Sequence, residues 1–319
     1  MDQEKDIQRE LSAMEDSIRA RSRDGCITTG LARSFQRFLS LFYASCGRDL
    51  PWRRTTDPYR ILVSEFMLQQ TGVERVLAKY PEFLGRFPDI GALARAPRHE
   101  VLLAWQGLGY NRRALALHET ARRIRDEFHG MVPLARTLLD SFPGIGSATA
   151  GAIVVFSTNG PEVFIETNIR RVYIHLFFPG AVRVHDREIE PILQKTLLRK
   201  NPREFYYALM DYGSALKKGL WDPNGSALRK GTGDPNGSLL KKGAGNPNTR
   251  SASYSRQSPF EGSDRQVRGM VLRHLLEGGG VREGELTRVI AIEPGRLERI
   301  LTGLERDGFI ERSGGRIRC

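Results

Sequence analysis

The sequence of 319 residues predicts an all-α protein, on three observations. Apolar side chains recur at helical spacing in residues 31–215, as at Leu31, Phe35 and Phe38. Strand-like alternation is scarce, and short Gly and Pro breaks separate the helical segments. Hydrophobic residues make up 40% of the chain and charged residues 27%, which allows a sizeable core. No long apolar run exists and the N-terminus is acidic, so neither a membrane span nor a secretory signal is expected.

The patterns divide the chain into four parts. Residues 1–30 are a polar N-terminal extension that begins as a helix, and residues 31–215 are the helical domain, whose hydrophobic pattern fits about ten helices. Residues 216–262 are a basic linker and residues 263–319 a separate module. The linker is too rich in Gly, Pro and Asn to bury a core. It contains three tandem copies of a 12-residue unit: LKKGLWDPNGSA, LRKGTGDPNGSL and LKKGAGNPNTRS.

The last 57 residues, 263–319, predict three helices and a terminal hairpin. Helical segments are expected at residues 265–276 and 283–290. A third begins at Pro294, a favoured first-turn residue, and continues to residue 306. A hairpin is expected around Gly314 and Gly315. This order predicts a winged-helix-like module, a type that binds DNA or a protein partner.

Charge and cysteine content limit the partners and cofactors. The formal net charge is +12, and the whole excess lies within residues 31–251. A polyanion such as nucleic acid suits this distribution, although a solvated basic surface would also produce it. The three cysteines are far apart, which excludes a disulfide framework and any four-cysteine zinc or iron–sulfur site within this chain: Cys26, Cys46 and Cys319. We therefore expect an intracellular protein with neither a metal nor another cofactor.

A turn with the sequence FPGIG, at residues 142–146, lies between two helical patterns. Gly144 and Gly146 allow a tight turn and a close approach of the backbone to a ligand. The helix that follows offers free N–H groups and a positive dipole end, which favour a phosphate. We expect Gly144, Ile145 and Gly146 to hold DNA backbone; the alternative is an ordinary corner between helices.

Glu65 lies in the segment DPYRILVSEFMLQQTG, which predicts a helix that begins at Pro58. It shares a helical face with Ile61, Leu62 and Leu68. Apolar surroundings disfavour the charged form, so we expect a raised pKa for Glu65. Such a group can act as a general acid near neutral pH. The structural alternative is a buried glutamate that pairs with an arginine from elsewhere.

Glu166 follows an apolar segment in VFIETNIRRV, where a carboxylate is costly unless it is paired or functional. Pairing with Arg170 or Arg171 is the structural alternative. One protonated and one charged carboxyl group suit cleavage of an N-glycosidic bond. The acid protonates the departing base, and the carboxylate stabilises the cationic sugar or positions water. A base in duplex DNA must be flipped out for this reaction.

Residues 49–213 resemble the helix-hairpin-helix DNA glycosylase superfamily, the endonuclease III-like enzymes. Within it they are most similar to the adenine glycosylases of A/G and A/8-oxoguanine mismatches. The order and spacing of six motifs match over about half of the chain, and SEFMLQQT is the most specific. The motifs are LPWR (50–53), SEFMLQQTGV (64–73), GLGY (107–110), FPGIGSATAGAI (142–153), ETN (166–168) and MDYG (210–213).

The resemblance implies a two-lobed fold and a role for each matching residue. Glu65 would protonate N7 of adenine, Glu166 stands where the family has its catalytic Asp, and Asn168 would position the water or the sugar. Tyr110 matches the residue that wedges into the base stack. The opposite base and flipped strand would contact Gln69, Gln70 and Thr71, and the base pocket would include Trp52 and Arg53.

Four departures from the family qualify these expectations. Glu166 is one methylene longer than the family's Asp. Ala148 stands where bifunctional relatives carry a lysine nucleophile, which favours a monofunctional enzyme. Lys217 stands at the first of the four cysteines that hold the family's [4Fe–4S] cluster. The family's C-terminal domain for 8-oxoguanine is replaced by the winged-helix-like module.

The sequence thus predicts a monofunctional DNA repair glycosylase that releases mispaired adenine opposite guanine or 8-oxoguanine. We expect a monomer that acts on mismatched double-stranded DNA, away from membranes, in the cytoplasm at the nucleoid. One alternative is a thymine or uracil mismatch glycosylase on the same fold. Another is a DNA-binding protein with impaired catalysis, which the glutamate at position 166 and the missing cluster cysteines would suit.

Overall fold

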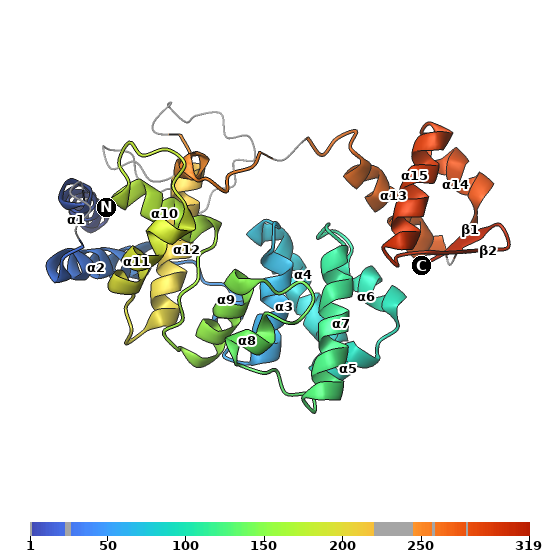
Figure 1. Cartoon of the computed structure of the whole chain (residues 1–319), viewed down its shortest axis with the longest axis horizontal. Coiled ribbons are helices and arrows are strands. Elements are labelled where there is room, and N and C mark those ends of the chain that lie inside the picture. The colour runs from blue at the N-terminus through green and yellow to red at the C-terminus, as the bar shows by residue number, and fades with distance from the viewer. Residues whose placement is uncertain (1, 23–26, 220–244, 257–258, 279) are drawn as a thin grey trace. The chain divides into compact units, whose positions relative to one another are not determined.

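The computed structural model describes residues 2–22, 27–219, 245–256, 259–278 and 280–319, most of which are helical (Figure 1). Contacts divide the chain into a first unit, Met1–Arg54 with Ser147–Ser255, and a second unit, Thr55–Gly146 with Arg256–Cys319. The predicted all-α, two-lobed fold is confirmed. No helix among the described residues is long and apolar enough to cross a membrane.

The first unit is built around three helices that pack on one another: α2, α10 and α12. Phe35 of α2 meets the ring of Tyr173 of α10 edge-on, with ring centroids 5.6 Å apart. Phe38 contacts Tyr212 of α12 in the same way, at 5.0 Å. The unit comprises α1 (Asp2–Arg21), α2 (Thr29–Cys46), η1 (Pro51–Arg53), α9 (Ser147–Thr158), α10 (Thr167–Phe177), α11 (Asp186–Thr196), α12 (Pro202–Lys218) and η2 (Pro247–Arg250).

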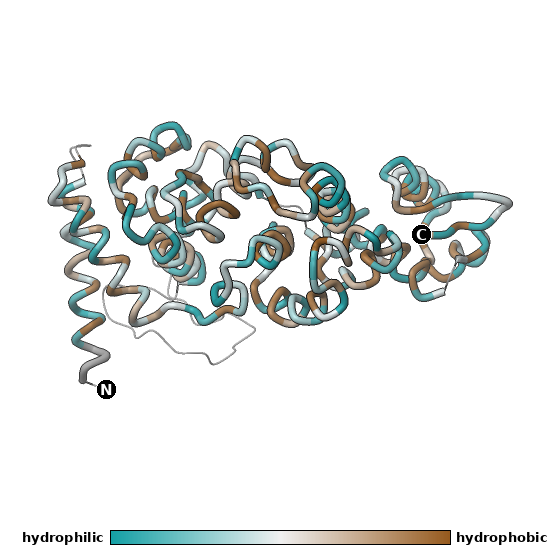
Figure 2. Tube along the Cα trace, turned by 90° about the horizontal axis from the view of Figure 1, so that it is seen from below, coloured by the Kyte–Doolittle hydropathy of each residue, from teal (hydrophilic) through white to brown (hydrophobic). Residues whose placement is uncertain are grey.

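The polar N-terminal extension belongs to this unit, because α1 packs on α2 and α10. Bands of hydrophobic and hydrophilic residues alternate along α1 in Figure 2, and Leu11 and Ile18 are fully buried. Glu15 is also buried, and its Oε1 lies 2.6 Å from Nε2 of His175. A buried carboxylate needs such a partner. The extension is therefore a structural part of the first unit.

The second unit begins with a well-capped helix, α3. The Asp57 side chain accepts hydrogen bonds from the backbone N–H groups of Tyr59 and Arg60, and Pro58 occupies the first turn. Phe83 and Trp105 meet edge-on in the core at 5.9 Å. The helices of this part are α3 (Pro58–Leu68), α4 (Val73–Arg86), α5 (Ile90–Arg95), α6 (Arg98–Trp105), α7 (Arg112–Glu127) and α8 (Arg136–Leu139).

The C-terminal module has the element order that the sequence predicts, with one additional short strand. Its elements are α13 (Asp264–Gly278), β1 (Val281–Arg282), α14 (Glu283–Ile290), α15 (Pro294–Arg306), β2 (Glu311–Ser313) and β3 (Arg316–Arg318). The strands form an antiparallel sheet in the order β1-β3-β2. Asp307 pairs with Arg112 at 2.7 Å and with Arg268 at 2.6 Å, which joins the module to α7. Its identification as winged-helix-like stays a prediction.

The end of the predicted linker is structured, which differs from the expectation for residues 216–262. Residues 220–244, most of the repeats, lie outside the described residues. After them, η2 packs on α10. Arg250 donates hydrogen bonds to the carbonyl oxygens of Phe178, at 2.6 Å, and Ile174, at 3.0 Å. A basic side chain satisfies the free carbonyl groups at the end of a helix, so the described end of the third repeat copy, residues 245–251, docks on α10.

Candidate active site and DNA-binding elements

Glu65 lies on α3 in the second unit, half-buried between neighbours that are fully buried. Ile61, Leu62 and Phe66 are at most 1% exposed. The apolar helical face that the sequence predicts around Glu65 is therefore present. The raised pKa expected for Glu65 stays a prediction.

Arg113 of α7 organises the turn that follows α3. Its guanidinium donates to the carbonyl oxygens of Phe66, at 2.8 Å, and Met67, at 2.9 Å, which are near the C-terminal end of α3. It also donates to Oγ1 of Thr71 at 2.8 Å and to the carbonyl oxygen of Gly109 at 2.9 Å. Burial lowers the pKa of Arg113 to about 10. One buried cation thus joins the Gln69–Thr71 turn to the GLGY loop.

Two predicted DNA-contacting residues have an unusual backbone conformation. Gln70 has a φ of 55° and Tyr110 a φ of 48°, in the left-handed region that side chains other than glycine rarely adopt. Tyr110 is 38% exposed, and its ring lies 5.6 Å from the Arg113 guanidinium carbon. Strain of this kind persists where surrounding contacts hold it, and it often marks functional sites.

The two glycines of the predicted DNA-binding turn have different local requirements. Gly144 has a φ of 78°, and a Cβ there would lie 2.8 Å from the Phe66 ring and 2.9 Å from Cβ of Ala116. Packing within the second unit therefore accounts for Gly144. A Cβ at Gly146 would meet nothing within 4 Å. Ile145 has a buried side chain, so it can offer a ligand only its backbone.

The FPGIG turn is held in place by α7 and by Gln69. Thr120 donates its hydroxyl hydrogen to the carbonyl oxygen of Pro143 at 3.2 Å. Arg123 donates to the carbonyl oxygen of Ser141 at 3.0 Å. Gln69 donates its amide hydrogen to the carbonyl oxygen of Gly144 at 3.0 Å. The structure thus brings Gln69 and the turn together, although the sequence placed them in separate motifs.

Glu166, in the first unit, is the N-cap of α10. Its Oε1 accepts hydrogen bonds from the backbone N–H groups of Asn168, at 2.8 Å, and Ile169, at 3.0 Å. The proposed partners are used elsewhere: Arg170 pairs with Asp186 at 2.6 Å, and Arg171 donates to other groups. An ion pair with either arginine therefore does not explain Glu166, whereas helix capping does.

The surroundings of Glu166 favour its protonated form. Burial raises the pKa of its carboxyl group, and this effect exceeds the lowering by the N–H groups of Asn168 and Ile169 and by the charges of Arg171 and Arg170. A carboxylate held here is poorly hydrated and fixed in direction. Both properties strengthen its interaction with a positive charge that develops nearby.

Asn168 is fixed by a network centred on the buried Arg171. The Asn168 amide donates to Oε2 of Glu166 at 3.3 Å, and its Oδ1 accepts from Nη1 of Arg171 at 2.6 Å. Arg171 also donates to the carbonyl oxygen of Gly213 at 2.7 Å and to Oδ1 of Asn246 at 2.8 Å. A Cβ at Gly213 would lie 2.5 Å from the carbonyl oxygen of Asn168, so glycine is required there.

Trp52 and Arg53, the predicted base-pocket residues, are buried in the first unit. Arg53 donates to both carboxylate oxygens of Asp211, at 2.8 and 2.7 Å, and lies over the Tyr207 ring at 4.5 Å. Burial alone would raise the pKa of Asp211, but Arg53 and Arg48 hold it below its usual range. These contacts give Arg53 a structural role, and its place in a base pocket stays a prediction.

The residues present do not fit the family's iron–sulfur cluster. Four cysteine thiolates are needed, and the whole chain has three cysteines. Lys217, at the first cluster position, lies in the last turn of α12. Burial raises the pKa of Cys319 to about 11, which disfavours a thiolate ligand. Within the described part of the chain, no group of His, Cys, Asp and Glu side chains could hold a metal ion.

Three positioning residues were not predicted from the sequence: Arg113, Arg171 and Asn246. Arg113 follows GLGY in the segment YNRRALA, and its partners lie up to 47 residues away. For Arg171 the sequence suggests only a pairing with Glu166. Glu166 stands just before a helical pattern, where an N-cap is expected, although glutamate is not among the residues usually found there.

Comparisons with known proteins agree on one family. Residues 63–197 match the HhH-GPD superfamily base excision DNA repair protein family. The adenine DNA glycosylase of Mycobacterium tuberculosis (strain ATCC 25618 / H37Rv) is 34% identical over 287 residues, 86% of this chain and 90% of that protein. The adenine DNA glycosylase of Buchnera aphidicola subsp. Baizongia pistaciae is also 34% identical, over 57% of this chain and 52% of its own length.

A solved structure of a thermostable thymine-DNA glycosylase is 24% identical, with a TM-score of 0.52, and covers 57% of this chain and 86% of that one. This similarity concerns the fold alone. The mycobacterial relative matches along most of both chains, at an identity that indicates common descent. On this evidence the chain belongs to the adenine DNA glycosylase family, within the HhH-GPD superfamily of base excision DNA repair proteins.

Proposed function

We propose that this protein is a monofunctional DNA glycosylase that hydrolyses the N-glycosidic bond of adenine mispaired with guanine or 8-oxoguanine. The observation that carries the proposal is the match to adenine DNA glycosylases over 86% of the chain. The local structures of Glu65 and Glu166 supply the two carboxyl groups that the reaction needs. We further propose that the protein acts as a monomer on double-stranded DNA.

Glu65 is the general acid in this proposal. Its apolar neighbours Leu62 and Phe66 favour the protonated carboxyl group. A protonated Glu65 can donate its hydrogen to N7 of a flipped adenine, which makes the base a better leaving group. The bond between the sugar and the base then breaks with its electron pair on the base.

Glu166 stabilises the positive charge that develops on the sugar. Its carboxylate is held by the N–H groups of Asn168 and Ile169, so little reorganisation is needed during the reaction. Asn168, held in turn by Arg171, positions the attacking water or the sugar. Water attacks the sugar carbon and loses a proton, which balances the proton that Glu65 donated and restores its acid form. The abasic site and free adenine are the products.

Ala148 is the basis for a monofunctional enzyme. It occupies the position where the bifunctional members of the resembling family have a lysine, and alanine has no amine to form a Schiff base with the sugar. The abasic strand should therefore remain intact until alkali is added. The reaction needs no iron–sulfur cluster in this proposal, since the cysteines for one are missing.

DNA would be held through its backbone by the FPGIG turn and through its bases by the Gln69–Thr71 turn and Tyr110. The open space around Gly146 leaves room for a phosphate to approach the backbone. The exposed ring of Tyr110, fixed by the GLGY loop, can stack on a base.

The test is release of free base from duplexes with A·G, A·8-oxoguanine, T·G and U·G pairs, at one enzyme concentration. We expect adenine release from the first two duplexes, with strand cleavage only after alkali. Release of thymine or uracil instead of adenine would identify the protein as a thymine or uracil mismatch glycosylase. Tight DNA binding without release of any base would contradict the proposed activity.

A further inference from the structure

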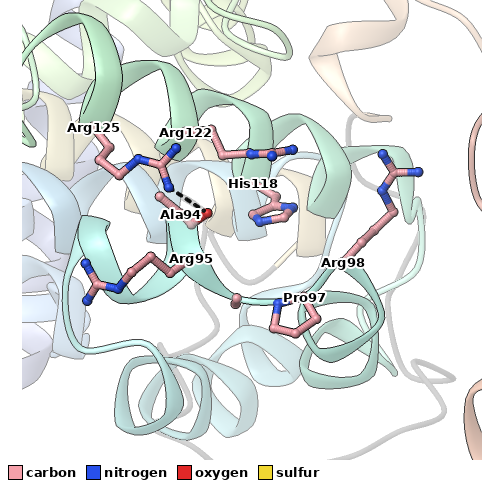
Figure 3. A pocket seen from close by; sticks show the side chains of 8 residues that line it. Ala94, Arg95, Pro97, Arg98, His118, Arg122 and Arg125 are labelled. Carbon is pink, nitrogen blue, oxygen red and sulfur yellow. Dashed lines mark hydrogen bonds between the residues drawn. The ribbon is translucent and has the colours of Figure 1, made fainter.

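A pocket on the second unit is lined by cations and lacks acidic lining residues. Its volume is about 610 Å³. It lies where the end of α5 meets the beginning of α6, with α7 as the third wall. Its lining residues are Ala94, Arg95, Ala96, Pro97, Arg98, His118, Arg122 and Arg125. Figure 3 shows the His118 ring in this pocket with Arg122 and Arg98 near it.

His118 has an unsatisfied ring nitrogen in the pocket wall. The side chain is 7% exposed, and one ring nitrogen bonds to the backbone of Ala96. Nε2 is buried and has no hydrogen-bond partner among the described residues. Most buried polar atoms have a partner, so one without it points to a missing ligand. Burial, followed by the charges of Arg122 and Arg98, lowers the pKa of His118, and these effects exceed the raising by the Ala96 hydrogen bond and by Glu119.

Three of the four lining arginines have no acidic partner in the described part of the chain, and two of these have no hydrogen-bond partner there either. Arg125 pairs with Asp126 and donates to the carbonyl oxygen of Ala94 at 3.4 Å, and Arg98 donates to that of Gly308 at 2.8 Å. No such contact holds Arg95 or Arg122. The cap of α6, Pro97, has no side-chain bond to the first N–H groups of that helix. Those groups add to the positive end of the helix dipole.

We propose that this pocket binds a phosphate group with at least three unesterified oxygens, either inorganic phosphate or the terminal phosphate of a nucleotide or DNA strand. Guanidinium groups match phosphate oxygens in pairs, and several of them suit a compact dianion. Hydrogenphosphate, or a terminal phosphate in its monoanionic form, has a protonated oxygen that can donate to Nε2 of His118. This inference does not depend on the proposed glycosylase activity.

The test measures binding of inorganic phosphate by titration calorimetry, with chloride keeping the ionic strength constant. We compare the full-length wild type with Arg122→Gln and with Arg187→Gln, which removes one exposed charge from the first unit. Arg122→Gln should weaken phosphate binding by about tenfold or more, since hydrogen bonds between charged groups are strong. Arg187→Gln should bind like wild type. Because Arg122 is exposed, its variant should fold normally and keep its rate of base release.

A second arm identifies the source of the phosphate by comparing a trinucleotide with a 5′-phosphate and the same trinucleotide with a 5′-hydroxyl. Preference for the phosphorylated form, lost in Arg122→Gln, assigns the pocket to strand ends or nucleotides. Binding of inorganic phosphate alone assigns it to the free anion. His118→Phe, which keeps the ring but removes both nitrogens, should weaken either ligand. Equal phosphate binding by wild type and Arg122→Gln, or none by wild type, would overturn the proposal.

Discussion

Arg171 donates its Nε hydrogen to Oδ1 of Asn246 at 2.8 Å across 75 residues of sequence. Arg171 is 2% exposed and also holds Oδ1 of Asn168. The third repeat copy thus supports the end of α10 that carries Glu166 and Asn168. The first two copies have Asp222 and Asp234 at the position of Asn246, so all three copies have an acceptor there.

Asn246→Leu should destabilise the first unit and slow base release. Loss of the acceptor leaves part of a buried guanidinium without a partner, which costs about 1–3 kcal/mol. Asn168 would then be held less firmly, because Arg171 fixes it. Urea unfolding and single-turnover base release measure the two effects. Asn246→Asp keeps the acceptor and is the control; equal effects of both variants would show that the contact with Arg171 is not the cause.

Arg113→Met should disturb the Gln69–Thr71 turn and the GLGY loop together. The variant leaves several buried carbonyl oxygens without a donor, so we expect a loss of about 3 kcal/mol or more. Arg299→Met is the control, because it removes an exposed arginine from helix α15 of the same unit. The free energy of unfolding is the measurement. A small loss in Arg113→Met, similar to the control, would contradict the organising role of Arg113.

Gly144→Ala should lower the stability of the protein, whereas Gly146→Ala should lower its affinity for DNA. At Gly144 a Cβ collides with Phe66 and Ala116 and the φ is positive, so the variant should lose stability. Gly146→Ala has space for the methyl group and should fold normally. If its backbone contacts DNA, affinity should fall equally for matched and mismatched duplexes. Fluorescence anisotropy with both duplexes tests this, and a loss confined to the mismatch would be incompatible with a backbone clamp.

Glu166→Gln should separate stability from activity. Because the pKa of Glu166 is raised in the folded protein, its ionised form costs stability once the pH exceeds the ordinary glutamate value of 4.5. Glutamine can still accept the N–H bonds of the cap. The free energy of unfolding of Glu166→Gln should therefore increase relative to that of wild type as the pH rises from about 4.5 through the raised pKa. Below pH 4.5 this difference should not depend on pH.

The base-release rate should change in the opposite direction. Glu166→Gln removes the stabilising charge and should lower the single-turnover rate by ~10²-fold or more. Glu166→Asp keeps both the charge and a good N-cap, so it should retain activity. The wild-type rate should rise with pH as Glu166 ionises while Glu65 is still protonated, and Glu166→Gln should lack this rise. If Glu166→Gln released base at the wild-type rate, Glu166 would have only a structural role, as the N-cap of α10.

Local signals in the sequence predicted local structure well. Pro294 marks the beginning of α15, and the pattern after it gave its extent, residues 294–306. The helical face around Glu65 also follows from spacing alone. Contacts between distant segments were not predictable, since neither Glu15 with His175 nor Arg171 with Asn246 leaves a periodic pattern. The docking of η2 on α10 is also not predictable, because the composition of its segment is that of a linker.

Single-turnover release of adenine from an A·G duplex by wild type and Glu65→Gln tests the central claim most directly. The amide keeps the shape of the side chain but cannot donate the proton that N7 of adenine needs. We expect wild type to release adenine, and Glu65→Gln to bind the same duplex with similar affinity but to release none. Release by Glu65→Gln at the wild-type rate would contradict the assignment of Glu65 as the general acid.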